Sequence, residues 1–163
     1  MTSSKKKADA EEGLHMICRN RRAFHEYEIS DRLECGIVLT GTEVKSLREA
    51  SSSLEDAYAK LEKGEVWLIG SDIPEYSMGN RLNHKPKRPR KLLLHRREIA
   101  KFADKASQRG FTLVPLRMYF KDGRAKVEIG VARGKQLYDK RQDQKKSQAQ
   151  REIRRAMSER HRR

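Results

Sequence analysis

The chain has 163 residues, with 38 Lys and Arg against 23 Asp and Glu, which gives a formal net charge of +15 at pH 7 and a pI near 10.1. This length suits one domain with extensions, and the charge favours a polyanion, above all nucleic acid, because binding releases condensed counterions. No segment is apolar enough for a transmembrane helix or a secretory signal peptide, so we expect a cytoplasmic protein with no membrane partner.

The cysteines and histidines do not form the groupings that metal binding or catalysis requires. Cys18 and Cys35 lie far apart and belong to no CxxC pair, so we expect free thiols. The chain also lacks a glycine-rich phosphate loop, paired carboxylates beside a histidine, and a nucleophile next to a base. We therefore predict no catalytic residue, no metal site and no cofactor. The dipeptide His25-Glu26 keeps a metal-dependent nuclease open as a weak alternative.

The first predicted strand follows a polar N-terminal segment. Residues 1–16 contain too few apolar groups to be buried and are predicted to be disordered. From Tyr27 to Leu39, apolar residues occupy most odd positions and polar residues fall between them, as in a half-buried strand. Ser30-Asp31-Arg32 and Gly36 are expected to bend this long strand. Glu34 lies on its polar, outward side.

A short helix and a hairpin come next. Thr40 and Glu43 have the spacing of a capping box, so we expect a helix from Thr40 to about residue 50. Lys63-Gly64 then separates two alternating segments, 57–62 and 65–69. A two-residue turn there puts the apolar residues on one side and gives two facing pairs, Leu61 with Val66 and Ala59 with Leu68.

The second hairpin has the strongest local signal. Before it, apolar residues from Ile99 to Ala106 follow helical spacing, and Gly110 is placed to end that helix. Asp122-Gly123 then predicts a type I′ turn, whose register sets Lys126 outward beside Tyr119. The same register predicts four apolar pairs: Phe120 with Ala125, Met118 with Val127, Leu116 with Ile129, and Val114 with Val131.

These elements predict a mainly β domain at residues 17–133. Five or six strands interrupted by two short helices, without βαβ alternation, are typical of an antiparallel, OB-fold-like β-barrel with flanking helices.

The first basic segment runs from Arg81 to Arg97 and contains eight Lys and Arg residues and no acidic residue. Pro86 and Pro89 keep its first part extended, so it is predicted to be a stiff loop that follows a phosphate backbone. A merely solubilising loop is the alternative.

The second basic segment is the tail, residues 134–163. After Gly134 it carries eleven Lys and Arg residues against four acidic residues, and past Tyr138 its only sizeable apolar residues are Ile153 and Met157. Such a segment cannot pack as a domain. We predict a basic C-terminal tail that is disordered when free and becomes helical on RNA.

Four stretches, in order along the chain, resemble the SmpB family, the SsrA-binding proteins of bacterial trans-translation. They are Asn20-Arg-Arg-Ala-Phe-His-Glu-Tyr27, Gly41-Thr-Glu-Val-Lys-Ser-Leu-Arg48, Arg88-Pro-Arg-Lys-Leu-Leu-Leu94, and Val127-Glu-Ile-Gly-Val-Ala-Arg-Gly-Lys135 followed by Tyr138-Asp-Lys-Arg141.

The resemblance implies a function in ribosome rescue. The barrel would bind the tRNA-like domain of transfer-messenger RNA (tmRNA, or SsrA RNA), and the complex would enter stalled 70S ribosomes so that incomplete proteins are tagged. The tail would occupy the empty decoding centre of 16S rRNA and the mRNA channel. Elongation factor Tu with alanyl-tmRNA would be an indirect partner of a monomeric protein. The alternative is a ribosomal or initiation-factor-like OB-fold protein that binds rRNA alone.

The resemblance also implies site residues. The RNA-binding set is Asn20, His25, Glu34, Arg90, Lys91, Leu93 and Lys126. The decoding-centre set is Gly134, Lys135, Tyr138, Asp139, Lys140 and Arg141. Glu34 and Lys126 agree with the outward directions predicted from strand alternation, whereas an apolar residue such as Leu93 could equally belong to the core. Tyr138 stands where relatives also have His, so a stacking role would survive there and a protonation role would not.

Overall fold

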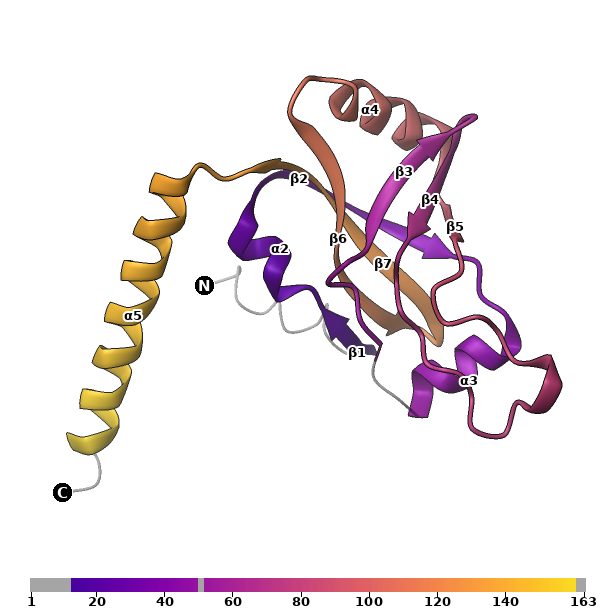
Figure 1. The fold of residues 1–163 in the computed structure, drawn as a ribbon, viewed down its shortest axis with the longest axis horizontal. Coiled ribbons are helices and arrows are strands. Elements are labelled where there is room, and N and C mark those ends of the chain that lie inside the picture. Colours follow the sequence, from indigo (N-terminus) through magenta and orange to yellow (C-terminus); the bar gives the residue numbers. More distant parts are fainter. Residues whose placement is uncertain (1–12, 50–51, 161–163) are drawn as a thin grey trace.

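The computed structural model describes residues 13–49 and 52–160 and has a mainly antiparallel sheet with a few helices, as predicted (Figure 1). In chain order the elements are β1 (Leu14–Arg19), α2 (Arg21–Glu26), β2 (Tyr27–Ile37), α3 (Gly41–Glu49), β3 (Tyr58–Glu62), β4 (Glu65–Ile69), a 3-10 turn (Asn80–Leu82), β5 (Arg90–Leu93), α4 (Arg96–Ala106), β6 (Phe111–Lys121), β7 (Arg124–Gly134) and α5 (Leu137–Arg160).

The strands form one seven-stranded sheet in the order β1-β6-β3-β4-β5-β2-β7, with a further pairing of β6 with β7. All pairings are antiparallel. They lead from β6 through β7, β2, β5, β4 and β3 back to β6, while β1 pairs with another part of β6. The main core lies on the inner face of these strands and includes Leu68, Met118, Val127 and Ile129, each at most 1 % exposed.

Both predicted hairpin turns are confirmed. Lys63 and Gly64 have φ of 50° and 75°, and Asp122 and Gly123 have φ of 50° and 73°, the left-handed values that a type I′ turn needs. Next to the turns the registers are those predicted, with Leu61 opposite Val66, Ala59 opposite Leu68, Phe120 opposite Ala125 and Met118 opposite Val127.

Farther from the second turn the predicted register is wrong. The pairing of β6 with β7 shifts between Pro115 and Arg117, so Ile129 lies opposite Pro115 instead of Leu116, and Val114 lies opposite Gly130 instead of Val131. A β-bulge at Leu116 explains the shift, because one extra residue moves the following side chains to the other face. Leu116 accordingly packs outside the main core, in a second cluster with Ala23, Val114 and Ala132.

A second bulge lies in β2, between Ile29 and Asp31, where Ser30-Asp31-Arg32 was expected to bend the strand. It turns Ile29 toward the second cluster, whereas Leu33 packs on the main core. The two bulges meet over Gly130, because a Cβ there would lie 3.0 Å from Ile29 Cγ2 and 3.1 Å from Leu116 Cδ1. Only a residue without a side chain leaves both leucine and isoleucine in place.

Two predictions about the chain ends and helices need correction, and a third is not confirmed. Residues 14–16 begin β1 and are not disordered, because they pair with β6; residues 1–12 lie outside the described residues. The helix before β6 ends at Ala106, and Gly110, with φ of 89°, forms the turn that follows. The disordered tail is not confirmed either: residues 137–160 form α5, which extends from the sheet in Figure 1.

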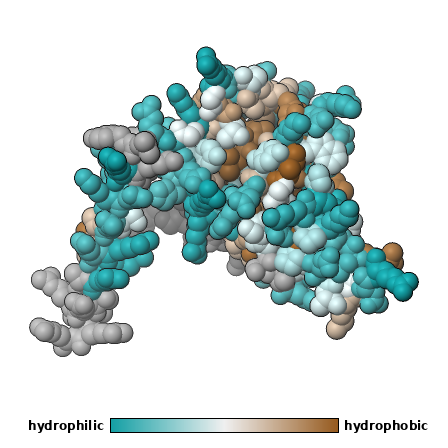
Figure 2. Space-filling view, viewed as in Figure 1, coloured by the Kyte–Doolittle hydropathy of each residue, from teal (hydrophilic) through white to brown (hydrophobic). Residues whose placement is uncertain are grey.

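The surface is mainly polar. Figure 2 shows hydrophilic side chains over most of the visible face and over the described part of α5. Among the described helices, none is long and apolar enough to cross a membrane.

We predict that Gly130→Ala lowers the free energy of unfolding by about 1–3 kcal/mol, because the added methyl group overpacks the site between Ile29 and Leu116. Urea unfolding followed by circular dichroism measures this change. Gly134→Ala is the control, since no atom lies within 4 Å of a Cβ built there. Equal stability of the two variants would show that the packing around Gly130 relaxes freely.

Candidate nucleic-acid interface

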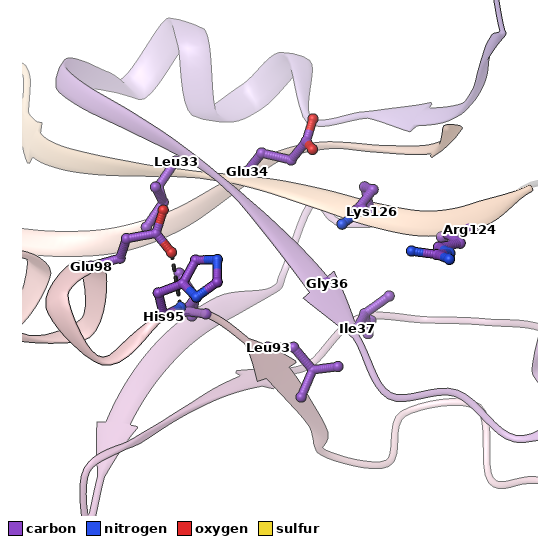
Figure 3. Close-up of a pocket in the computed structure, with 11 residues that line it drawn as sticks. Leu33, Glu34, Gly36, Ile37, Leu93, His95, Glu98, Arg124 and Lys126 are labelled. Carbon is purple, nitrogen blue, oxygen red and sulfur yellow. Dashed lines mark hydrogen bonds between the residues drawn. The ribbon is translucent and has the colours of Figure 1, made fainter. Parts of the chain in front are cut away.

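Three neighbouring strands bring separate parts of the sequence together around Gly36. Gly36 of β2 pairs with Leu93 of β5 on one side and with Lys126 of β7 on the other. Glu34 precedes Gly36 by two residues and shares its face. These residues line a cleft of about 720 Å³, together with His95, Glu98 and Arg124 among others (Figure 3). The sheet register alone therefore assembles Glu34, Leu93 and Lys126 into one surface.

The close approach of β2 and β5 exposes Leu93. A Cβ on Gly36 would lie 3.2 Å from Leu93 Cβ, so the leucine leans over the glycine backbone. Leu93 is 52 % exposed, whereas its neighbour Leu92 is 2 % exposed and packs in the main core. Leu93 is thus a surface residue of the cleft and not part of the core, which leaves its side chain free to contact a ligand.

Glu34 is held by donors from β6. Its Oε2 atom accepts a hydrogen bond of 2.5 Å from the Tyr119 hydroxyl, and Lys121 Nζ lies 3.3 Å from both carboxylate oxygens. Although burial alone would raise the pKa of the Glu34 carboxyl, the bonds from Tyr119 and Lys121 and the charges of Lys121 and Lys126 lower it below its usual value. Glu34 is therefore ionised at neutral pH and can only accept hydrogen bonds from a ligand.

Cations surround this carboxylate on the outward face of the sheet. Lys126 is half-buried and its side chain donates no hydrogen bond to any described residue, and Arg124 is exposed at the same cleft. Glu128, opposite Glu34, is already paired with Arg117 and lies 3.8 Å from Arg32 Nη1. Such a surface can bind phosphates through Lys126 and Arg124 while Glu34 accepts an N–H or O–H donor.

The amino-acid sequence of this chain is similar to that of a known protein family over most of its length. The SmpB protein family matches residues 17–159 of the chain. The chain belongs to the SmpB family. It is 57% identical over 156 residues to the SsrA-binding protein of Thermobifida fusca (strain YX), covering 96% of this chain and 98% of that protein. It is 54% identical over 145 residues to the SsrA-binding protein of Geobacillus kaustophilus (strain HTA426), covering 89% and 94%.

A solved structure matches as well. It is described as "tmRNA-SmpB: a journey to the center of the bacterial ribosome". The matching chain has a TM-score of 0.63 and 47% sequence identity, and the match covers 74% of this chain and 85% of that one.

Two of the residues predicted to contact RNA are buried in this structure, and the first is Asn20. Its side chain is 1 % exposed. Its Nδ2 atom donates to the carbonyls of Leu54 and Pro115, both at 3.0 Å, and its Oδ1 atom accepts from Ala23 N–H at 3.0 Å. Asn20 therefore caps α2 and ties it to β6, and three of the four hydrogen bonds that its amide can make lie within the fold.

The second is Arg90, which is 0 % exposed on the inner side of β5. Its Nε atom donates to Glu43 Oε1 at 2.9 Å, Nη1 to the Ser71 carbonyl at 2.8 Å, and Nη2 to the Pro86 carbonyl at 2.9 Å. Alternation along β5 places Arg90 with Leu92 inside and Lys91 with Leu93 outside. All three nitrogen atoms of this guanidinium therefore donate hydrogen bonds within the fold.

Glu43 is the partner that the sequence did not reveal. Its predicted capping bond is present, since Oε2 accepts from Thr40 N–H at 2.8 Å, but the carboxylate is also 0 % exposed and paired with Arg88 at 2.6 Å and Arg90. Although burial alone would raise the pKa of the Glu43 carboxyl, the bonds from Arg88 and Thr40 and the charge of Arg90 lower it. The burial of Glu43 could not be predicted from the sequence, because its position in a capping box already explained an acidic residue there.

The basic segment 81–97 is consequently only partly available for a ligand. Arg88 and Arg90 neutralise Glu43, and Lys91 is ion-paired with Glu65 of β4. The other five cations are exposed and have no acidic partner within the described residues: Arg81, Lys85, Lys87, Arg96 and Arg97.

The remaining predicted residues lie at the junction of sheet, α2 and α5. His25 is exposed on α2 and lines a cleft with residues of α5, including Lys146 and Arg151. Gly134 ends β7, and Lys135 N–H donates to the Glu26 carbonyl at 2.9 Å. Of the first turn of α5, Arg141 is exposed, while the side chains of Tyr138, Asp139 and Lys140 lie outside the described part.

We predict that Arg90→Ala lowers the free energy of unfolding by about 3–5 kcal/mol, because it removes one of the two arginine partners of the buried Glu43 carboxylate. Arg81→Ala, at an exposed position, should change it by less than about 0.5 kcal/mol. Urea denaturation measures both. A small effect of Arg90→Ala would contradict the structural role assigned to this residue.

A second prediction concerns Tyr119→Phe, which removes one donor from Glu34 and should raise the pKa of that carboxyl. NMR titration of the Glu34 side chain measures it, with Tyr58→Phe on β3 as the control. Because the folded pKa is lowered, Glu34 stabilises the native state above its unfolded pKa, and this contribution is lost as the pH falls through the folded pKa. The variant should lose less stability on acidification, and an unshifted Glu34 would refute the contact.

Proposed function

We propose that this protein is an SsrA-binding protein that binds the tRNA-like domain of tmRNA and delivers it to stalled ribosomes for tagging of incomplete proteins. The observation that carries the proposal is the cleft around Gly36, where Glu34, Leu93 and Lys126 form one exposed surface. These are three of the positions at which the SmpB resemblance implies RNA contact. Membership of that family, with relatives named SsrA-binding proteins, supports the same function over an rRNA-only protein.

The proposed architecture is an OB-fold-like barrel that acts without catalysis, metal or cofactor, as a monomer in the cytoplasm. The circular order of strand pairings supports the barrel, because six strands each find two partners. RNA would contact the outward face of β2, β5 and β7, with Lys91 and His25 as flanking contacts. Elongation factor Tu would be reached only indirectly, through alanyl-tmRNA.

The tail is proposed to act separately, in the decoding centre and mRNA channel of the ribosome. Ile153 and Met157, its sizeable apolar residues past Tyr138, are 56 % and 66 % exposed, so packing on the domain contributes little to α5. Most of the stability of helices in proteins comes from the packing of an apolar face, which α5 largely lacks. This favours a tail that is disordered when free and helical on rRNA, with Gly134, Lys135 and the segment from Tyr138 to Arg141 at the decoding centre.

The identity of the bound RNA tests the proposal directly. Sequencing of RNA that co-purifies with the full chain from bacterial cells should show strong enrichment of tmRNA. Recovery of rRNA alone would support the alternative, a ribosomal or initiation-factor-like protein. Lys126→Ala should weaken binding to the tRNA-like domain and flatten its salt dependence by about one unit of slope.

We further predict that truncation after Gly134 leaves binding to the isolated tRNA-like RNA nearly unchanged and abolishes tagging on stalled ribosomes. The reason is that the truncation keeps every residue of the cleft and removes residues 135–163, which include α5. Gel-shift titration and an in vitro tagging reaction measure the two activities. Large loss of binding to the free RNA would contradict this division of function.

A further inference from the structure

The loop between β4 and β5 presents two large apolar side chains to solvent. Leu82 is 90 % exposed and Met78 is 78 % exposed, the highest values among the large apolar residues that the structure describes. In Figure 1 this segment protrudes beside α3. Single exposed apolar residues are ordinary in proteins, so these two are informative only if the loop is ordered in a conformation that exposes them.

The tip of the loop is closed by Asn83. Its Oδ1 atom accepts from Tyr76 N–H at 3.1 Å and its Nδ2 atom donates to the Tyr76 carbonyl at 2.7 Å. Gly79 N–H donates to the same carbonyl at 2.9 Å, and a Cβ on Gly79 would lie 2.7 Å from Asn83 Nδ2. Asn80 has φ of 44°, in the left-handed region. Met78 and Leu82 thus project from a defined turn.

Both arms of the loop are fixed to α3. On the first arm, Ser46 Oγ donates to the Pro74 carbonyl at 2.5 Å. On the second, the buried His84 ring contacts Thr42 Oγ1 at 3.0 Å and the Ile73 carbonyl at 3.1 Å. The entropy of ordering the tip is therefore largely lost during folding and need not be lost again on binding.

The charge around the tip is positive. Arg81, Lys85 and Lys87 are exposed and have no acidic partner in the described part of the chain. Glu75 is the one acidic residue in the sequence between Ile73 and Pro89. An ordered apolar tip with a cationic border matches a ligand that offers both phosphates and uncovered apolar faces.

We propose that this tip, residues 76–87, is a second RNA-binding surface, distinct from the cleft around Gly36, for RNA whose bases are unpaired or irregularly stacked. Met78 and Leu82 pack on an uncovered base or ribose, while Arg81, Lys85 and Lys87 bind the adjacent phosphates. A regular A-form helix does not fit, because its deep, narrow major groove excludes side chains. The inference rests on the proposed function, since it takes RNA as the partner.

Two RNAs could supply this chemistry, the tRNA-like domain of tmRNA and rRNA of the small ribosomal subunit, so the experiment uses both. The full chain and the double variant Met78→Ser/Leu82→Ser are titrated with each. The expected result is an affinity loss of about tenfold for one of them with an unchanged salt slope. Leu61→Ser, which changes an apolar residue 37 % exposed at the end of β3, is the matched control and should bind normally.

A triple variant tests the cations. Arg81→Gln/Lys85→Gln/Lys87→Gln should lower the salt slope for the same RNA by about two units, at roughly 0.7 per phosphate contact on single strands. Asn83→Ala removes the hydrogen bonds that close the tip, so it should weaken binding to that RNA. Thermal melting should show that the domain of this variant is still folded.

Two results would overturn the inference and leave the proposed function intact. In the first, the parent chain binds tmRNA, and the double and triple variants bind each RNA as tightly as the parent chain does. In the second, the double variant binds both isolated RNAs normally and loses affinity only for intact small ribosomal subunits, which would identify a protein as the partner. A parent chain that binds neither RNA would instead refute the proposed function, and this inference with it.

Discussion

The buried carboxylate of Glu43 makes the ion pairs on which the arrangement of α3, β5 and the cleft around Gly36 depends. It lies at the start of α3 and accepts hydrogen bonds from Arg88, at the end of the long loop, and from Arg90, the first residue of β5. A buried ion is tolerated only with its partners in place, so α3, the loop and β5 are fixed relative to one another. Because β5 then continues with Leu92 inside, Leu93 must face outward beside Gly36.

The two bulges set the other end of the molecule in a comparable way. By reversing the faces of β2 and β6 over Gly130, they create a second small core that packs α2 against the sheet. Lys135 then bonds to Glu26 at the end of α2, which fixes the point where the tail leaves the domain. The direction from which the tail reaches a ribosome is therefore determined by packing that lies far from its own basic residues.

Sequence reasoning succeeded where the signal was local and failed where distant segments meet. The turns at Lys63-Gly64 and Asp122-Gly123 were predicted because their residue types select a left-handed backbone. The bulge at Leu116 leaves no such mark, since residues 113–116 are all apolar and polar alternation therefore does not reveal which face each of them takes. The burial of Arg90 was not predicted for a different reason, because its partner Glu43 lies 47 positions away and was explained as a helix cap.

Only part of the net positive charge is available to RNA, because some cations form ion pairs within the fold. Cations of the 81–97 segment that pair with Glu43 and Glu65 stabilise the fold and add nothing to counterion release on RNA. Cations that form no ion pair within the described residues can add to the attraction for RNA, and two of them are Lys126, half-buried at the cleft, and Lys85, exposed at the loop tip. Charge of this kind supplies affinity for any RNA, so selectivity must come from the uncharged and acidic groups between the cations. Glu34 and Leu93 occupy that place in the cleft, and their contribution would persist at salt concentrations that screen the cations.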